Sequence, residues 1–221
     1  MTRTPVALYG AGHLGRQIHY HLLAWHADRC EVLGFIDDTQ PPGLEVIDGS
    51  RTLGSLAAAL GDPRLRPGAA RLVFAIGYSN MMARRAALER VLGAGYELFE
   101  VIHPRASIEP GAAPGAGSVV LACAVLDQQV RLGPACFVDI GVRLGAGTVA
   151  GANNYFSSGT STGSRVRIGD DCFFGMDCTI TTDVTVGSNL FVNAKTLVAR
   201  DLGSNLKLVE LHKSRELPQA R

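Results

Sequence analysis

Residues 168–180 read Ile-Gly-Asp-Asp-Cys-Phe-Phe-Gly-Met-Asp-Cys-Thr-Ile, and the spacing of their large apolar residues continues in one phase from Ile102 to Val198. Every sixth residue of this stretch is apolar except Thr162, and the fourth residue after each of them is mostly small. A period of six fits neither an α-helix nor a β-sandwich, but it fits a coil with flat sides of about six residues. Three sides would close a triangular turn, with the large side chains inside and the small ones near the corners.

Glycine often follows the large residue of the repeat, at positions 115, 133, 145, 151, 163, 169, 175 and 187. At these corners we expect either a positive φ or a close approach of two backbones, since glycine tolerates both. Three of the five cysteines, Cys136, Cys172 and Cys178, occupy the small inward position. No Cys-x-x-Cys pair or zinc-like spacing occurs, so we expect these thiols to be structural and the protein to hold no metal.

The chain has 221 residues, 47% of them apolar, which is enough for two cores. We expect two domains, residues 1–100 and 101–202, and a tail, 203–221. The 21 basic and 20 acidic residues leave a net charge of +1, which gives no electrostatic footprint for nucleic acid. The first residues do not read as a signal segment, and no apolar run reaches the roughly eighteen residues of a membrane span. We therefore expect a cytoplasmic protein that does not bind a membrane.

The first residues fit a strand, a glycine turn and a helix. Val6–Tyr9 is an apolar run, Gly10-Ala11-Gly12-His13-Leu14-Gly15 follows it, and a helical pattern continues to about His26. A second apolar run, residues 31–36, ends in Asp37-Asp38, about twenty residues beyond the last glycine. In Rossmann-like units of this kind the helix N-terminus binds a phosphate and the acid binds a ribose hydroxyl. Alternatively, the glycines only let the strand and the helix pack closely.

The rest of the first hundred residues predicts further elements of a parallel sheet. We expect a polar loop over residues 39–49, a helix over 53–60, strands over 71–76 and 96–102, and a helix over 81–92. Open parallel sheets bind ligands beyond the carboxyl ends of their strands. The loops at 10–15, 37–38 and 77–80 should therefore converge on one site.

A small Rossmann-like domain followed by a hexapeptide-repeat prism resembles the bacterial nucleotide-sugar acetyltransferases of bacillosamine, perosamine and sialic acid pathways. The resemblance covers residues 5 to about 202, and its markers are the glycine turn, Phe35-Ile36-Asp37-Asp38, Ala75-Ile76-Gly77, Ile102-His103-Pro104 and the hexads. It implies a left-handed parallel β-helix that assembles as a homotrimer, with acetyl-CoA or another acyl-CoA in the groove between neighbouring prisms. It also implies a role in cell-surface polysaccharide biosynthesis.

The resemblance also implies which residues bind the two ligands. The contacts to the nucleotide sugar would be Gly10, Gly12, His13, Asp37, Asp38, Gly77 and Asn80. The family's turn ends in Gly-Gly-His-Gly, whereas this one ends in Gly12-His13-Leu14-Gly15, which displaces the histidine by one position. Backbone N–H groups at Gly163 and Ser164 would donate to the thioester oxyanion. Ser164, Met176 and Ala194 would line the coenzyme site.

The hexad that supplies the family's catalytic base is altered here. In the family it reads Ile-Glu-His-Glu/Asp-x-Val, whereas residues 144–149 read Leu-Gly-Ala-Gly-Thr-Val, so Ala146 replaces the histidine and Gly147 the acid. No histidine lies between His103 and His212, so a shift within the prism does not restore the base. A sugar hydroxyl needs a base more than an amine does, because an amine with a pKa of about 8 is already partly neutral. The sequence therefore favours N-acyl over O-acyl transfer.

Two functions follow from these observations. The first is an acyl-CoA-dependent N-acyltransferase of a nucleotide-linked amino sugar, with Tyr155, Asp139 or Asn153 as the substitute catalytic group. Each of the three also has a structural explanation: Asn153 suits a corner with positive φ, Asp139 caps a turn, and Tyr155 stacks on a coil face. The second is a catalytically inactive relative that binds a sugar nucleotide or a partner protein. In the tail, residues 206–211 alternate like a strand, which would pair along a prism edge or pack on a neighbour.

Overall fold

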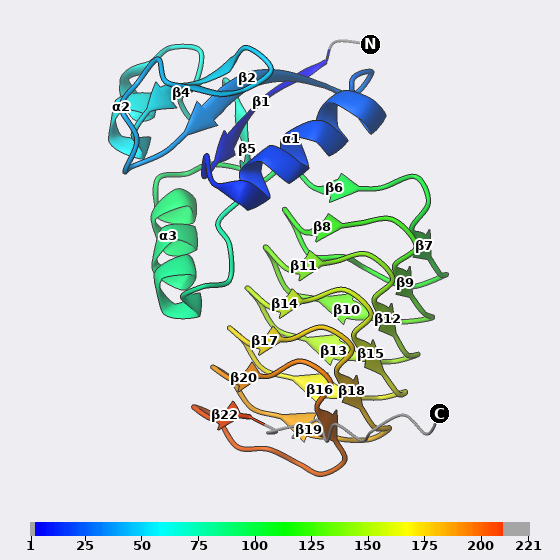
Figure 1. Ribbon diagram of the computed structural model, residues 1–221. Helices are drawn as coiled ribbons and strands as arrows, with labels where there is room; N and C mark the ends of the chain where they lie inside the picture. Colours follow the sequence, from blue (N-terminus) through cyan, green and yellow to red (C-terminus); the bar gives the residue numbers. More distant parts are fainter. Residues whose placement is uncertain (1–2, 210–221) are drawn as a thin grey trace, which may run out of the picture.

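A five-stranded sheet forms the centre of the N-terminal domain in the computed structural model, which describes residues 3–209 (Figure 1). Its order is β3-β4-β2-β1-β5, and all neighbours are parallel except β3 and β4. The strands are β1 (Thr4–Tyr9), β2 (Cys30–Ile36), β3 (Glu45–Ile47), β4 (Ser50–Gly54) and β5 (Arg71–Phe74). The helices are α1 (His13–Trp25), α2 (Leu56–Gly61) and α3 (Met81–Gly93).

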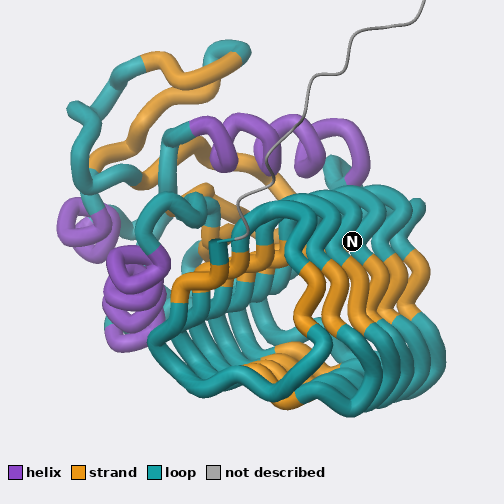
Figure 2. The backbone as a smooth tube through the Cα atoms, turned by 60° about the horizontal axis from the view of Figure 1, so that its bottom comes forward, coloured by secondary structure: helices purple, strands orange, loops and turns teal. Residues whose placement is uncertain are grey.

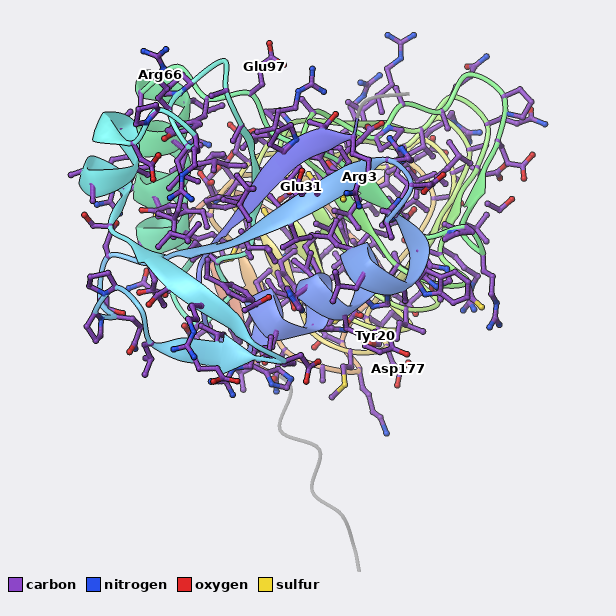
Figure 3. All side chains as sticks on the ribbon, turned by 90° about the horizontal axis from the view of Figure 1, so that it is seen from above. Arg3, Tyr20, Glu31, Arg66, Glu97 and Asp177 are labelled. Carbon is purple, nitrogen blue, oxygen red and sulfur yellow. The ribbon has the colours of Figure 1, made fainter. Side chains whose placement is uncertain are left out.

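Helices cover both faces of this sheet. Val6 and Leu8 of β1 pack with Ile18 of α1, whereas Ala7 and Tyr9 pack in the cluster that contains α2 and α3. The side chains of a strand alternate between its two faces, so the apolar run of β1 is buried on both sides. Figure 3 looks down on this domain and shows Arg3 and Glu31, near the amino ends of β1 and β2, on the surface turned away from the repeat domain. The carboxyl ends of the strands point the other way.

Three expectations for the N-terminal domain are corrected by the structure. The helix expected over 53–60 begins only at Leu56, because residues 50–54 form β4. Ser55 sets the boundary, since its side chain accepts a hydrogen bond from the Ala58 N–H (3.2 Å) and caps the helix. The other two differences are β3, which lies inside the expected loop 39–49, and the expected strand 96–102, of which only a bridge between Leu72 and Leu98 and the short β6 are found.

Two-residue strands of the repeat domain stack into three parallel sheets around a triangular interior (Figures 1 and 2). The first sheet holds β6 (Val101–Ile102), β8 (Val119–Val120), β11 (Phe137–Val138), β14 (Tyr155–Phe156), β17 (Phe173–Phe174), β20 (Phe191–Val192) and β22 (Lys207–Leu208). The second holds β7 (Ser107–Ile108), β9 (Val125–Leu126), β12 (Arg143–Leu144), β15 (Ser161–Thr162), β18 (Thr179–Ile180) and β21 (Leu197–Val198). The third holds β10 (Arg131–Leu132), β13 (Val149–Ala150), β16 (Arg167–Ile168) and β19 (Thr185–Val186).

The hexad phase decides which side chains fill this prism. The large apolar residue of each hexad points inward. Successive coils stack similar side chains on one another, as in Phe156 and Phe174, whose ring centroids lie 5.2 Å apart. Three corners join the sheets. We call residues 139–141 and their equivalents in other coils the first corner, 145–147 the second and 151–153 the third.

Glycine follows many of the large residues because the backbones of two successive coils approach closely there, and not because φ is positive. A Cβ added to Gly115 would lie 2.1 Å from the carbonyl oxygen of Gly133, and one added to Gly145 would lie 2.5 Å from that of Gly163. The positive φ falls two residues later, at every sixth residue from Gly111 to Lys195. Asparagine, aspartate or glycine fills most of these later positions, because these residues tolerate the left-handed conformation.

The prism extends beyond residue 202. Lys207 and Leu208 pair in parallel with Phe191 and Val192, so the tail adds a strand to the first sheet. This is the edge pairing that was one of the two expectations for the tail. Residues 210–221, the rest of the tail, lie outside the described residues.

Four histidines lie where α1 faces the sheet and the prism. His19, His26 and His103 are buried, and the ring of the half-buried His21 meets that of His103 at 5.6 Å. Burial lowers the pKa of all four imidazoles, and neighbouring positive charge from Arg29 adds to the effect at His26. Neither ring nitrogen of His26 has a hydrogen-bond partner. These rings are therefore held neutral in the folded protein.

We expect the protein to lose stability as the pH falls from 7.5 toward 5. A histidine whose pKa is lowered by folding binds protons more readily when unfolded, so its stabilising contribution is complete above about pH 6.5 and is lost below it. Thermal unfolding midpoints measured across this range should fall steadily for the wild type. They should fall less for His26→Leu, in which one of these groups is gone. An equal fall in both proteins would contradict this assignment.

Candidate active site

The turn between β1 and α1 is built on three glycines, two of which admit no side chain. Gly10 has a φ of +117°, and an added Cβ would lie 2.7 Å from the Ala75 carbonyl oxygen; a Cβ on Gly15 would lie 2.1 Å from that of Gly10. The N-cap of α1, Gly12, makes no side-chain cap. The first N–H groups of α1 are therefore available to an anion, and the helix dipole favours one there.

Asp37 braces this turn. Its carboxylate accepts hydrogen bonds from the Ala11 N–H (2.8 Å) and from the N–H and hydroxyl of Thr39 (2.8 and 2.6 Å). Burial alone would raise the pKa of the Asp37 carboxyl, but these hydrogen bonds outweigh it and hold the pKa below its ordinary value. The carboxylate is mostly occupied by the protein itself, so its contact to a ribose hydroxyl stays a prediction.

Asp38 belongs to a cluster that the sequence did not reveal. Its carboxylate accepts hydrogen bonds from the Leu56 N–H (2.9 Å) and the Tyr9 hydroxyl (2.6 Å), and lies 3.0 Å from the Arg90 guanidinium. Burial raises the pKa of Tyr9, and the hydrogen bond to Asp38 raises it further, so Tyr9 stays a donor. Tyr9 could have been found as the last residue of β1, at the carboxyl edge of the sheet. Nothing in the sequence around Arg90, near the end of α3, indicated that it lies close to Asp38.

These residues surround a hollow of about 330 Å³ at the carboxyl ends of β1, β2 and β5, which we call the nucleotide cavity. Its volume falls in the range of small-molecule pockets, about 300–1,000 Å³. The three predicted loops converge here as expected. The predicted residues that line it are Gly10, Gly12, Asp37, Asp38 and Gly77.

Replacing Gly12 by valine should weaken nucleotide binding without unfolding the domain. Nothing lies within 4 Å of a Cβ at Gly12, where the backbone is extended, so the new side chain fits the backbone but fills the cavity. We expect the Kd for UDP or GDP, measured by calorimetry, to rise more than about tenfold while the unfolding midpoint changes little.

The control for this substitution is Gly15→Val, which should unfold the domain because its Cβ would lie 2.1 Å from a carbonyl oxygen. Unchanged affinity in Gly12→Val would show that the ligand binds elsewhere. Both variants are compared with the wild type in the same thermal unfolding assay.

Two further cavities continue from the first. The middle cavity, about 430 Å³, shares Gly12 and Gly77 with the nucleotide cavity and is also lined by His13 and Tyr155. The corner cavity, about 310 Å³, shares Tyr155 with the middle cavity and reaches the first corner of the prism. The predicted residues Asp139, Met176 and Ala194 line this last cavity.

Tyr155 and Tyr78 form an aromatic stack on the outer face of the first sheet. The Tyr155 ring lies 4.5 Å from that of Phe137, and the Tyr78 ring lies 4.8 Å from Tyr155 and 4.4 Å from Phe173. Burial raises the pKa of Tyr155, and the charge of Asp139 raises it further. Tyr155 can therefore donate a hydrogen bond but is a poor base at neutral pH. Tyr78, whose loop was noted but whose side chain was not, lines both the middle and the corner cavity.

Asn153 lies in the joint between the two domains. It is buried at the third corner with a φ of +60°, and its side-chain oxygen accepts a hydrogen bond from the guanidinium of Arg84. Arg84, itself 1% exposed, also donates to the carbonyl oxygens of Ile76 (2.9 Å) and Ala135 (3.0 Å). The Asn153 amide in turn donates to Asp171 (2.8 Å).

Burial lowers the pKa of Arg84 to about 10, so the guanidinium remains charged at neutral pH. A buried charge needs every hydrogen bond it makes, because desolvating it costs several kcal/mol. These contacts support the structural explanation of Asn153, and it lines none of the three cavities.

Asn153→Ala should destabilise the protein by about 2–3 kcal/mol, since it removes a hydrogen bond to a buried charge. Asn189→Ala is the matched control, because Asn189 has the same left-handed φ (+57°) but bonds only to the exposed Asn205. Chemical denaturation of the two variants separates the buried contact from the cost of the backbone conformation. Equal destabilisation would refute the role given to Arg84.

Two other predicted residues act as caps. The Asp139 carboxylate accepts hydrogen bonds from the Ile140 N–H (2.8 Å) and the Ser158 hydroxyl (2.7 Å), and it also lines the corner cavity. Asn80 caps α3 by accepting from the Ala83 N–H (2.9 Å). Asn80 lines a separate hollow beside the last coils, so the structure does not bring it to the nucleotide cavity with the other predicted contacts.

Ala146, Gly163 and Ser164 lie at the second corner, one prism face away from the corner cavity, and they line none of the three cavities. The Gly163 N–H is already donated to the carbonyl oxygen of Ile180 (2.8 Å). The Ser164 N–H makes no backbone hydrogen bond within residues 3–209. Of the two expected oxyanion donors, Ser164 is therefore the one that is free.

No group of three or more His, Cys, Asp or Glu side chains in residues 3–209 is arranged to hold a metal. None of the helices in that range has the length and apolar character needed to cross a membrane.

No protein-family model and no curated protein sequence matches the chain. Several solved structures match it. A variant of perosamine N-acetyltransferase from Caulobacter crescentus, with CoA and GDP-perosamine bound, is 22% identical, with 96% of each chain covered and a TM-score of 0.83. The acetyltransferase domain of PglB from Neisseria gonorrhoeae FA1090, with acetyl coenzyme A, is 25% identical over 93% of this chain and 96% of that one (TM-score 0.82). WeeI from Acinetobacter baumannii AYE is 18% identical over 95% and 97% (TM-score 0.78).

These neighbours agree with what the sequence predicted. Two of them are acetyltransferases, and their structures hold CoA or acetyl coenzyme A, the expected cosubstrate. The comparison confirms the expected fold class, a Rossmann-like domain followed by a left-handed parallel β-helix, and with it the resemblance to acetyltransferases that use acetyl coenzyme A.

Proposed function

We propose that the chain is an acyltransferase that moves the acyl group of acetyl-CoA, or of another acyl-CoA, to an amino group of a nucleotide-linked sugar. One observation carries this proposal: the nucleotide, middle and corner cavities share lining residues and so form one path. Gly77 belongs to the first two cavities and Tyr155 to the last two. A nucleotide sugar entering from one end and a thioester entering from the other would meet beside Tyr155.

The nucleotide end of this path suits a diphosphate. The uncapped N-terminus of α1 offers N–H groups and a favourable dipole, and Arg90, at the same cavity, offsets the negative charge of Asp38. In the Caulobacter neighbour a nucleotide sugar, GDP-perosamine, is bound together with CoA. This fold can therefore hold both ligands at once.

The corner end suits the apolar arm of a coenzyme. The Met176 side chain is 57% exposed at the first corner, and Ala194 stands at the equivalent position of the next coil. Together they make a narrow apolar strip along the prism. Covering an exposed methionine with the pantetheine chain would remove apolar surface from water, which favours binding.

The active form would be a homotrimer whose neighbouring copies complete each site. Met176 and Asp139 stand at the first corner and Ser164 at the second, so one chain cannot bring the Ser164 N–H to its own corner cavity. A second copy could present its second corner there. At that corner Gly145, Ala146 and Gly147 are small enough to let another backbone approach closely.

Transfer to nitrogen is the reaction that this site would support best. The amine attacks the thioester carbon, and the negative thioester oxygen is stabilised by the Ser164 N–H. The C–S bond then breaks, and the proton lost by the amine nitrogen ends on the departing CoA sulfur. Holding the reactants in line supplies much of the rate, and a partly neutral amine needs less help from a base than a hydroxyl does. Such a reaction would take place in the cytoplasm and would feed cell-surface polysaccharide biosynthesis.

The test is turnover of acetyl-CoA with a panel of UDP-, dTDP- and GDP-linked amino sugars, followed by thiol release and by the mass of the product. We expect at least one sugar to gain an acetyl group. If none reacts although a nucleotide sugar raises the unfolding midpoint, the inactive, ligand-binding alternative is correct.

Met176→Glu should raise the KM for acetyl-CoA more than about tenfold, because it places a charge on the apolar strip. Met82→Glu is the matched control, since Met82 is equally exposed (57%) but lies on α3 outside the corner cavity. Steady-state kinetics at varied acetyl-CoA checks both. The same KM in both variants would place the coenzyme elsewhere.

A further inference from the structure

His13 is the one histidine among residues 3–209 that lines any of the three cavities. It is the first residue of α1 and is exposed, and it lines the middle cavity together with Gln17, Tyr78 and Tyr155. The histidines at 19, 21, 26 and 103 lie between α1, the sheet and the prism, away from all three cavities. Within residues 3–209 the His13 side chain makes no hydrogen bond or ion pair, so its ring is available to a ligand.

The three groups expected to replace the prism base are poorly suited to that role. Tyr155 is held as the phenol, and Asn153, an amide, is buried against Arg84. Asp139 lies in the corner cavity and already accepts two hydrogen bonds. An ordinary carboxylate, with a pKa of about 4, is also a much weaker base than an amine, whereas an imidazole changes charge between about pH 5 and 8.

The middle cavity is where the acceptor sugar would lie if the proposed function holds. A diphosphate at the N-terminus of α1 would sit next to the His13 backbone, and the sugar attached to it would extend from the nucleotide cavity into the adjoining one. The thioester would approach from the corner cavity across Tyr155. The imidazole of His13, Tyr78 and Tyr155 are the titratable side chains that line this meeting place.

We infer that His13 is the general base of the proposed acyl transfer and replaces the histidine that the prism lacks. As the amine nitrogen bonds to the thioester carbon, a neutral ring nitrogen of His13 takes the surplus proton from the nitrogen. The carbonyl reforms, the C–S bond breaks, and the imidazolium returns the proton to the departing CoA thiolate. The products are the amide and CoA thiol, and the imidazole is neutral again.

The inference rests on the proposed function, and its test is made with the sugar that the wild type acetylates. His13→Ala and His13→Gln should lower kcat by about 100-fold, toward the lower end of the loss expected for a missing general base. Imidazole added to the buffer should restore part of the rate of His13→Ala, whereas a residue that only binds the sugar would show a raised Kd for the nucleotide sugar and no such rescue. The unfolding midpoint, measured in parallel, reports whether each variant is folded.

Gln17→Ala is the matched control, because Gln17 lies one turn along α1 and lines the same cavity but cannot take a proton. Its kcat should not respond to imidazole. A wild type without activity on any sugar would overturn the proposed function and this inference together. An active wild type with a kcat in His13→Ala within about threefold of normal, or with a raised Kd and a normal kcat, would overturn the base role alone.

Discussion

The close stacking of successive coils is the constraint on which the rest of this structure depends. Backbone meets backbone at the corners, where a Cβ on Gly115 or Gly145 would lie 2.1 or 2.5 Å from a carbonyl oxygen of the next coil. The chain satisfies this by repeating one local conformation every six residues, with glycine at the tightest contacts and a left-handed residue two positions later. Because no insertion interrupts the phase, every residue of the prism is assigned to the interior, a face or a corner.

The joint between the two domains depends on a different interaction, the buried guanidinium of Arg84. It bonds to the chain on both sides, through Ile76 in the N-terminal domain and through Ala135 and Asn153 in the prism. Since an unpaired buried charge is expensive, the guanidinium fixes the position of α3 against the third corner. The loop between β5 and α3 starts beside Ile76, so the same bond holds Tyr78 over the first sheet and keeps the middle and corner cavities side by side.

Sequence patterns predicted what repetition and local chemistry determine. The period of six gave the prism, and the strand, glycine turn and helix around Gly10 gave the sheet edge at which the three loops converge. What the patterns missed depends on contacts between distant residues. Nothing near Arg90 indicates that it reaches Asp38, and nothing near Asn153 indicates that Arg84 is buried against it. The predicted start of the helix at residue 53 was wrong for a local reason, because Ser55 caps a helix that begins after β4.

The position of Ala146 gives the loss of the prism histidine a structural meaning. In the proposed trimer the second corner, where that histidine would stand, would approach the corner cavity only from a neighbouring copy, whereas His13 belongs to the same chain as the nucleotide cavity. A base on α1 would be held near the sugar by the helix that we propose binds the diphosphate, so its position would not depend on how accurately two prisms dock. The prism could then lose its own base and keep two tasks that need only backbone: binding the coenzyme between coils and offering an N–H at Ser164.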